Sequence, residues 1–226
     1  MEKYFTNVFN NLSDEEKESF YKTVILNDTS SYAQKARDEY YKKVLRYMGG
    51  NTHIGARVTI VNPQYISLGN NVQIFEGATL IARGKKGINI GDFTRIKERA
   101  ILDTERIDTG YISIDNNVYI GTGTTLFGHV GLEIGAYSLL AQNITITPYS
   151  HIYDNPSENI INQGGHCEKI VIGKDCYLGM NVSVMYSGSI GDGSIVGAGS
   201  VVIKTIPPYS VAVGVPAKVI KERKGK

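Results

Sequence analysis

Residues 172–202 read IGKDCYLGMNVSVMYSGSIGDGSIVGAGSVV, and this stretch decides the fold. A branched apolar residue returns at every sixth position, and a small or β-branched residue follows four positions after it. The apolar positions are Ile172, Leu178, Val184, Ile190, Val196 and Val202, and the accompanying ones are Cys176, Val182, Gly188, Ser194 and Ser200. A fixed period of six residues indicates a repeat solenoid. A β-sandwich with glycine-rich turns predicts strands of variable spacing instead.

The same period runs back through the chain to about residue 51. Three hexads complete one triangular coil of about eighteen residues, so we expect about six coils with an aliphatic column inside. Gly, Asn and Asp, which tolerate positive φ, stand at the expected corners, as in 69–71, 115–117 and 173–175. The earlier apolar positions are Ile54, Ile60, Leu68, Ile74, Leu80, Ile90, Ile96, Ile114, Ile120, Leu126, Ile134, Leu140 and Ile146.

The amino-terminal segment, residues 1–50, has no such period and is predicted to be helical. Ser13 followed by Glu16 forms a capping-box pattern, which marks a helix start. A second helix is expected from about Tyr32 to Met48, because Ala, Lys, Arg and Glu are frequent there and Gly49 follows as a stop. The chain therefore divides into a helical segment at 1–50, a solenoid at 51–221 and a basic tail at 222–226.

Composition excludes some partners. The net charge of the 226-residue chain is +2, too small to indicate a nucleic-acid partner. No stretch has the apolar length of a signal peptide or a membrane span, so we expect a soluble cytoplasmic protein. The two cysteines, Cys167 and Cys176, lack the spacing of a zinc site or a disulfide framework. Both are expected to be reduced, with Cys176 in the core.

One long insertion interrupts the repeat. The next apolar position after Ile146 is Ile172, 26 residues later, where six would continue the period. A loop at 147–169 must therefore leave the solenoid and return. Long loops held on a rigid scaffold commonly carry function, so this excursion loop is the first place to seek a site.

Several motifs resemble those of the hexapeptide-repeat acyltransferases, the left-handed parallel β-helix family that includes galactoside, maltose and capsular or lipopolysaccharide O-acetyltransferases. The resemblance covers about residues 50–221. It rests on Glu133-Ile134-Gly135 leading to Ser150-His151, on segments 172–179 and 190–202, and on the pairing of Ile206-Pro207-Pro208 with Gly214-Val215-Pro216-Ala217-Lys218-Val219-Ile220. The fold class implied is an all-β solenoid with a short helical segment and one excursion loop.

The resemblance implies that His151 is the catalytic general base. A neutral imidazole can take the proton of an alcohol as its oxygen attacks a thioester carbonyl. The peptide N–H groups around Gly179 and Met180 are the candidates for stabilising the oxyanion. His129 and Tyr149 are predicted to contact the acceptor, while His53 and His166 are expected to be surface residues. A loop histidine without a task is the alternative for His151.

The resemblance also implies acetyl-CoA as the acyl donor, with no metal required, in a groove between the subunits of a homotrimer. The predicted donor-binding residues are Tyr177, Gly179, Met180, Ala198, Lys204, Lys218 and Lys221. Lysine ammonium groups suit phosphates, although a solvated basic tail at 218–226 explains these lysines equally well.

Three positions depart from the family pattern. Tyr177 stands where a tryptophan is usual and keeps a flat amphipathic ring. Gly121 replaces an asparagine that helps to bind the acceptor in galactoside acetyltransferases, and Tyr186-Ser187-Gly188-Ser189 replaces a Pro-Gly-Val turn. A simple galactoside specificity is therefore not expected.

The predicted function is transfer of acetyl from acetyl-CoA to a hydroxyl of a sugar or polysaccharide precursor. The first alternative is N-acetylation of a nucleotide-linked amino sugar, although the short helical segment is no nucleotide-sugar domain. The second is a metalloenzyme like the γ-class carbonic anhydrases, with His129, His151 and His166 as candidate ligands. The third is a scaffold without catalysis.

Overall fold

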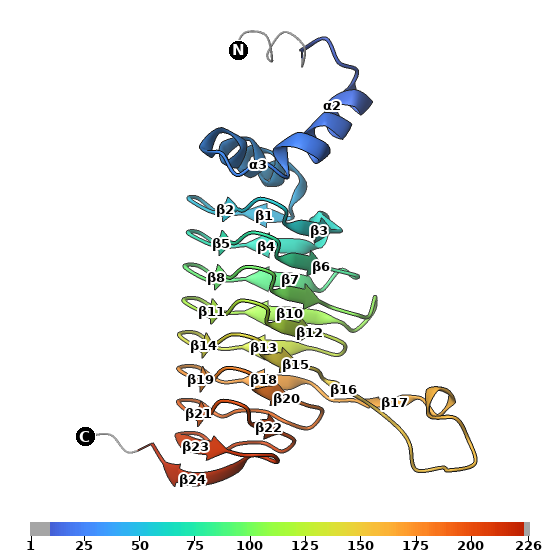
Figure 1. The fold of residues 1–226 in the computed structure, drawn as a ribbon, viewed down its shortest axis with the longest axis vertical. Helices are drawn as coiled ribbons and strands as arrows, with labels where there is room; N and C mark the ends of the chain where they lie inside the picture. Colours follow the sequence, from blue (N-terminus) through green and yellow to red (C-terminus); the bar gives the residue numbers. More distant parts are fainter. Residues whose placement is uncertain (1–9, 224–226) are drawn as a thin grey trace.

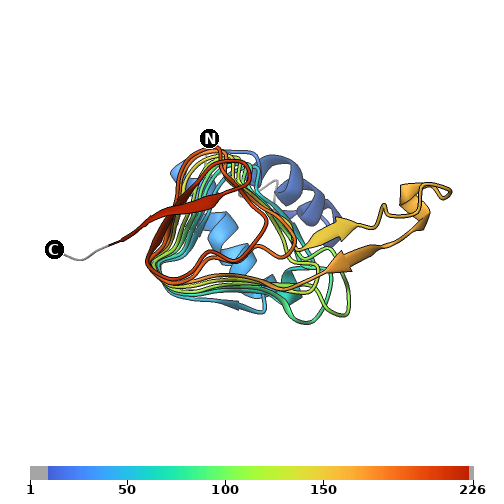
Figure 2. The same ribbon diagram turned by 90° about the horizontal axis from the view of Figure 1, so that it is seen from below.

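A computed structural model of the chain describes residues 10–223. It is a parallel β-solenoid (Figure 1) whose coils form a triangle when seen along the axis (Figure 2). The short strands stack into three sheets, named A, B and C in the order in which the chain enters them. The predicted solenoid is thereby confirmed.

The three sheets run the length of the solenoid. Sheet A contains β1 (Tyr47–Met48), β4 (Ile66–Leu68), β7 (Gly87–Ile90), β10 (Tyr111–Ile114), β13 (Leu132–Ile134) and β18 (Ile170–Ile172). Sheet B contains β2 (His53–Ile54), β5 (Gln73–Ile74), β8 (Arg95–Ile96), β11 (Tyr119–Ile120), β14 (Leu139–Leu140), β19 (Tyr177–Leu178), β21 (Ile195–Val196), β23 (Ser210–Val213) and β24 (Lys218–Glu222). Sheet C contains β3 (Thr59–Val61), β6 (Thr79–Ile81), β9 (Ile101–Asp103), β12 (Thr125–Phe127), β15 (Thr145–Ile146), β20 (Ser183–Val184) and β22 (Val201–Val202).

The register carries each inward residue onto its counterpart in the next coil. In sheet B the paired column is Ile54, Ile74, Ile96, Ile120, Leu140, Leu178 and Val196. These side chains are buried, as the six-residue period predicts. Ile60 differs, since it is only partly buried at the edge of the core.

The solenoid has about seven coils, one more than the sequence pattern predicted. The extra positions keep the six-residue spacing. Leu102 follows Ile96 by six residues, and Met48 precedes Ile54 by six, although Met48 lies inside the segment that was predicted to be helical. Both side chains are buried in the aliphatic core.

The corners adopt the predicted backbone conformation. Asn71, Asn117 and Asp175 have φ of 55°, 58° and 53°. Asn and Asp enter this left-handed region more readily than other side chains, because their short polar groups bond locally. Corner side chains of successive coils also bond to each other, since Asn51 Nδ2 donates to Asn71 Oδ1 in the next coil at 2.7 Å.

Helices cover the amino-terminal end of the solenoid. They are α2 (Asp14–Phe20), a π-helix η1 (Tyr21–Ile25) and α3 (Ser31–Val44). The capping box is present, because the Ser13 N–H donates to Glu16 Oε2 at 2.8 Å and the Glu16 N–H donates to Ser13 Oγ at 3.3 Å. The prediction that the second helix runs to Met48 was wrong. Tyr47 and Met48 form β1 instead, because Met48 packs in the core and pairs with Leu68.

A buried arginine attaches this cap to the first coil. Arg37 is 1% exposed. Its guanidinium donates to the carbonyl oxygens of Ile54 at 3.0 Å and Ile25 at 2.7 Å, and also to the carbonyl of Asp28. These bonds satisfy a charge that would otherwise be costly to bury. The cap protects the open end of the solenoid from pairing with another chain.

The remaining elements lie outside the coils. Two 3-10 turns occur, η2 (Pro63–Tyr65) and η3 (Ile160–Asn162). The excursion loop is a hairpin arm, in which β16 (Tyr149–His151) pairs antiparallel with β17 (Gly165–Cys167) and projects far from the solenoid (Figure 1). We call residues 149–167 the hairpin arm.

The carboxyl-terminal segment folds back on the last coil. β24 pairs antiparallel with β23, so Lys218 and Lys221 lie on a strand. Arg223 donates to Asp175 Oδ2 and to the Gly193 carbonyl, both at 2.9 Å. Residues 224–226, the rest of the predicted tail, lie outside the described residues. Both cysteines are free, with Cys176 buried and Cys167 half-buried.

Within residues 10–223, no helix combines the length and the apolar character needed to cross a membrane.

Candidate active site

A row of aromatic rings lies where the hairpin arm leaves the solenoid. The Tyr149 ring meets the His151 ring edge-on, with centroids 4.8 Å apart, and lies 5.2 Å from the His129 ring. His129 in turn lies 6.0 Å from Phe127. The structure therefore brings together the three side chains predicted to bind or activate the acceptor, namely His129, Tyr149 and His151.

The row forms because sheet C ends at this corner. β12 ends at Phe127, and His129 follows two residues later. β15 ends one coil further on, and the chain then continues into β16, which carries Tyr149 and His151. Insertions before β7, β10, β13 and β18 all emerge between sheets C and A. We call this edge the C–A corner.

Tyr149 orients the imidazole of His151. The Tyr149 hydroxyl oxygen lies 3.4 Å from His151 Nδ1. When Nδ1 carries the proton and donates it to this oxygen, the Nε2 lone pair is free to accept a proton from an alcohol. His151 is exposed, so an acceptor can reach it from solvent.

His129 lies deeper in the row and is held in its neutral form. Burial, followed by the positive charge of Arg106, lowers the pKa of His129, while Asp103 opposes the shift. A neutral imidazole both donates and accepts one hydrogen bond. His129 is therefore suited to bind a hydroxyl group at neutral pH.

Three charged residues at the C–A corner were not predicted from the sequence. The carboxylate of Asp103 is buried and accepts two bonds from Arg83, at 2.9 Å from Nε and 2.7 Å from Nη2. The Arg106 Cζ atom lies 5.9 Å from the centre of the Tyr149 ring. One signal was available: Asp103 is a carboxylate at an outward position where the paired residues are Ile81 and Phe127.

The predicted donor-binding residues form a second group at the corner between sheets B and C. Tyr177 and Met180 are 44% and 52% exposed, and Ala198 is exposed in the next coil. A Cβ on Gly179 would lie 2.6 Å from the Ala198 nitrogen, so only glycine permits this close stacking. Gly179 itself is buried, so the exposed surface of this donor-binding strip is formed by Tyr177, Met180 and Ala198.

One predicted oxyanion donor is already used. The Gly179 N–H donates to the Val196 carbonyl at 2.8 Å as part of the ladder between coils. It is therefore not free to bind an oxyanion. The Met180 N–H has no protein acceptor among residues 10–223 and is the remaining candidate.

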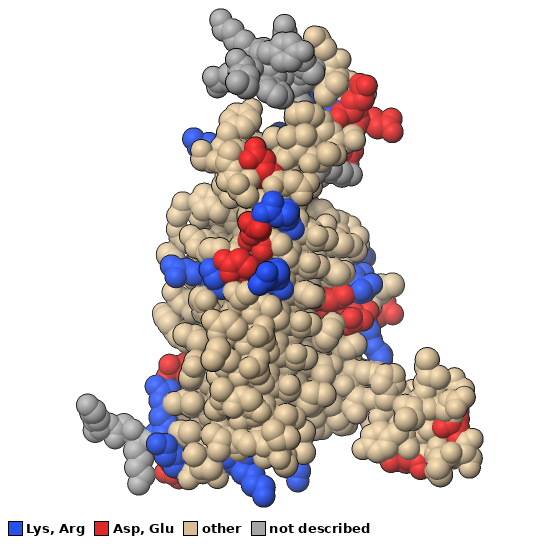
Figure 3. All heavy atoms as spheres, in the orientation of Figure 1, with Lys and Arg blue, Asp and Glu red and all other residues tan. Residues whose placement is uncertain are grey.

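The three lysines predicted to meet phosphates lie near the carboxyl-terminal end. Lys204 follows β22, and Lys218 and Lys221 lie on β24; all three are exposed. In the part of the chain that the structure describes, none of them pairs with a carboxylate. Lys and Arg gather at this end of the solenoid on the face shown in Figure 3.

The two groups occupy different corners of one chain. Met180 precedes sheet C, whereas Tyr149 and His151 follow it. Six residues of extended chain span about 20 Å. A single chain therefore does not bring the candidate base next to the candidate donor-binding strip.

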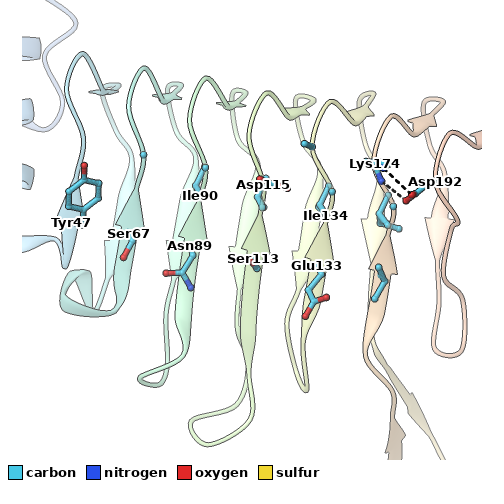
Figure 4. A pocket seen from close by; sticks show the side chains of 18 residues that line it. Tyr47, Ser67, Asn89, Ile90, Ser113, Asp115, Glu133, Ile134, Lys174 and Asp192 are labelled. Carbon is cyan, nitrogen blue, oxygen red and sulfur yellow. Dashed lines mark hydrogen bonds and ion pairs between the residues drawn. The ribbon is translucent and has the colours of Figure 1, made fainter.

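A shallow groove of about 630 Å³ lies elsewhere, on the outer face of sheet A. Tyr47, Ser67, Asn89, Ser113 and Glu133 stand in a row along it (Figure 4). None of the predicted site residues lines it. Within residues 10–223, no group of three or more His, Cys, Asp or Glu side chains could hold a metal ion.

Comparisons with known proteins agree with this architecture. Residues 169–204 match the family model described as the hexapeptide repeat of succinyl-transferase. Probable acetyltransferase Rv3034c of Mycobacterium tuberculosis is 31% identical over 183 residues, which cover 81% of this chain and 56% of that protein. Galactoside O-acetyltransferase of Escherichia coli is 35% identical over 113 residues, which cover 49% of this chain and 54% of that protein.

A similar solved structure is a mutant of AntD, an N-acyltransferase from Bacillus cereus, in complex with dTDP and coenzyme A. It shares 25% sequence identity at a TM-score of 0.60, with 82% of this chain and 89% of that chain covered. The chain is thus similar in sequence and fold to hexapeptide-repeat acyltransferases. It spans 56% and 54% of the two curated relatives named above.

Proposed function

We propose that the protein is an acetyl-CoA-dependent O-acetyltransferase that acts on a hydroxyl of a sugar or polysaccharide precursor. The observation that carries the proposal is the position of His151. It stands at the base of the hairpin arm, exposed, with Nδ1 facing the Tyr149 hydroxyl. A histidine held in this way can act as a general base through Nε2. Relatives named galactoside O-acetyltransferase and putative lipopolysaccharide biosynthesis O-acetyl transferase support the choice of reaction.

In the proposed reaction, His151 Nε2 takes the proton of the acceptor hydroxyl as its oxygen attacks the thioester carbonyl. The Met180 N–H of a neighbouring copy of the chain would stabilise the negative charge that develops on the carbonyl oxygen. The bond between the carbonyl carbon and sulfur then breaks, and the imidazolium returns its proton to the departing thiolate. Acetyl is thus transferred directly, without an acyl-enzyme.

The residues of the B–C corner suit a pantetheine arm. Gly179 is buried against the exposed Ala198, and the exposed Tyr177 ring and Met180 thioether lie beside them. Acetyl-CoA would contribute the activated acetyl group. Lys204, Lys218 and Lys221, which pair with no carboxylate within residues 10–223, offer ammonium groups for its phosphates.

The site is proposed to form between copies of the chain. His151 and Met180 lie on opposite sides of sheet C in one protomer, and a neighbouring protomer can place its B–C corner against this C–A corner. In a closed ring of three copies, each C–A corner meets the B–C corner of the neighbouring copy, so all three contacts are equivalent. We therefore propose a homotrimer with three shared sites.

N-acylation of a nucleotide-linked amino sugar is the second candidate. The similar AntD structure is that of an N-acyltransferase bound to dTDP and coenzyme A. An amine acceptor needs the same base at the same place, so the fold does not separate the two reactions. Comparing the rates of acetyl transfer to a hydroxyl sugar and to the matching amino sugar would separate them.

The direct test measures thiol release from acetyl-CoA by purified protein with a panel of sugars, sugar phosphates and nucleotide sugars. His151→Ala should lower kcat/KM by about 10²- to 10⁴-fold, the range for loss of a general base. His166→Ala is the matched control, because His166 lies on the paired strand β17 and stacks on Tyr186 instead. Equal rates for His151→Ala and the unmodified protein would refute His151 as the base.

A further inference from the structure

The loop at 104–109 is built around a buried carboxylate. Asp103 Oδ1 accepts the Glu105 N–H at 2.8 Å, in addition to its bonds from Arg83. The Arg83 N–H donates to Thr104 Oγ1 at 2.8 Å, which joins this loop to the coil before it. At the other end, Thr109 Oγ1 donates to the His129 carbonyl at 2.8 Å. The loop is therefore tied to the solenoid at both ends.

This loop presents Arg106 to the aromatic row. Its guanidinium stands over the Tyr149 ring, and its charge acts on His129. The two distances along the row place it within about 11 Å of the His151 ring. Contact with an aromatic face orients a guanidinium while leaving its donors free.

Arg106 and Arg83 differ in their charge partners. Arg83 is neutralised by Asp103, and Glu105 also acts on it. Arg106 is exposed and forms no ion pair with any carboxylate in residues 10–223. The C–A corner thus presents one unneutralised guanidinium beside the groups proposed to bind the acceptor.

We propose that Arg106 binds an anionic group of the acceptor, a phosphate or a carboxylate carried close to the hydroxyl that is acetylated. This inference rests on the proposed function, because it takes His151 as the acceptor site. Guanidinium donors match both groups through two parallel hydrogen bonds. The distance between Arg106 and His151 allows one sugar residue to place its hydroxyl at Nε2 and its anionic substituent at Arg106.

The test compares glucose, glucose 1-phosphate and glucuronate as acceptors in the thiol-release assay. The anionic acceptors should have the lower KM, and the preferred one identifies phosphate or carboxylate as the group bound. Arg106→Gln should raise that KM by about tenfold or more, which corresponds to the loss of one charge-assisted hydrogen bond. Arg106→Lys should restore part of the affinity.

The matched control is Lys35→Gln, which removes one positive charge from the exposed face of α3. Lys35→Gln should leave every KM unchanged. Arg106→Gln should leave the KM for acetyl-CoA and the KM for glucose unchanged. If Arg106→Gln weakens all acceptors equally, Arg106 has only a structural role. If the KM for glucose equals that for glucose 1-phosphate and glucuronate, the inference is overturned while the acetyltransferase proposal stands.

A binding experiment separates the inference from turnover. Glucose 1-phosphate should shift the imidazole NMR signals of His129 and His151 in the unmodified protein, and glucose at the same concentration should not. In Arg106→Gln, glucose 1-phosphate should shift these signals no more than glucose does. If thiol release is absent with every acceptor, the proposed function fails, and this titration still decides whether Arg106 binds an anion.

Discussion

The coils and the hairpin arm of this protein differ in both burial and periodicity. Inside the coils the branched side chains are buried and repeat in register from one turn to the next. Beyond His151, residues 153–162 of the arm are all exposed, and the arm leaves the solenoid at one corner (Figure 2). The difference teaches that the coils supply the free energy of folding, whereas the C–A corner is free to vary in length and to carry chemistry.

Removing the arm should produce the largest effect on function and almost none on the fold. Deletion of residues 150–167 leaves Tyr149 joined to Glu168, so that Ile146 and Ile172 stand eight positions apart. Ile60 and Leu68 already have that spacing. We expect acetyl transfer to fall by at least about 10²-fold, as for loss of the base. The midpoint of thermal unfolding should change by only a few degrees, and its collapse would show that the arm is part of the folding core.

A core substitution should give the opposite result. Leu178 is fully buried and pairs with Leu140 and Val196 in sheet B. Leu178→Ala should lower the free energy of unfolding by about 2–5 kcal/mol, because it removes apolar contact and leaves a cavity. Denaturant titration measures this loss. The kcat per folded molecule should stay near that of the unmodified protein, and a loss of less than about 0.5 kcal/mol would contradict the role assigned to the column.

Asp103 connects the two regions, so its substitution should affect both moderately. Asp103→Asn keeps the shape of the side chain but removes the charge that Arg83 pairs with. We expect a loss of about 1–2 kcal/mol, reduced by the partial exposure of Arg83. The KM for the acceptor should rise and that for acetyl-CoA should not. Glu105→Gln in the same loop is the control, because the bond to Asp103 uses its backbone N–H.

The smallest effect concerns the titration of His129. Its pKa is lowered in the folded protein, so the folded state resists protonation and the unfolded state binds the proton first. Stability should therefore decrease as pH falls below about 6.5, the ordinary histidine pKa. The decrease should level off below the folded-state pKa. His129→Gln should reduce this pH dependence in thermal unfolding.

Arg106→Gln should raise the His129 pKa, because it removes the nearby positive charge while burial continues to act. An NMR titration of the imidazole follows this directly. A pKa that stays in place would mean that burial alone controls His129.

The sequence predicts the coils because their constraint is periodic. Every sixth residue, as from Ile172 to Leu178, is apolar and points into the core. A shift of the register by one residue would turn these side chains out of the core. The prediction was incomplete at two positions that keep the period. Leu102 follows Ile96 by six residues and Met48 precedes Ile54 by six, yet neither was assigned to the column. The second helix was extended over β1 although its Met48 belongs to the core.

The site was only partly predictable. His129, Tyr149 and His151 were selected through the resemblance to the hexapeptide-repeat acyltransferases, and their rings do meet. Arg106 could not be selected in this way, because its place over Tyr149 depends on the shape of a loop that Asp103 holds from within. Local pattern predicts which corner carries an insertion, but the contacts between insertions of neighbouring coils need the three-dimensional structure.

The central claim is that the base and the donor-binding strip of each active site come from different copies of the chain. Two inactive variants, His151→Ala and Ala198→Trp, test it when they are unfolded together and refolded as a mixture. Ala198 is exposed beside Gly179, so a large ring there should block the donor without entering the core. If sites are shared, about a quarter of them in a random equal mixture combine two intact halves. We predict recovery of about a quarter of the unmodified activity, whereas a mixture as inactive as its two parents would contradict the account.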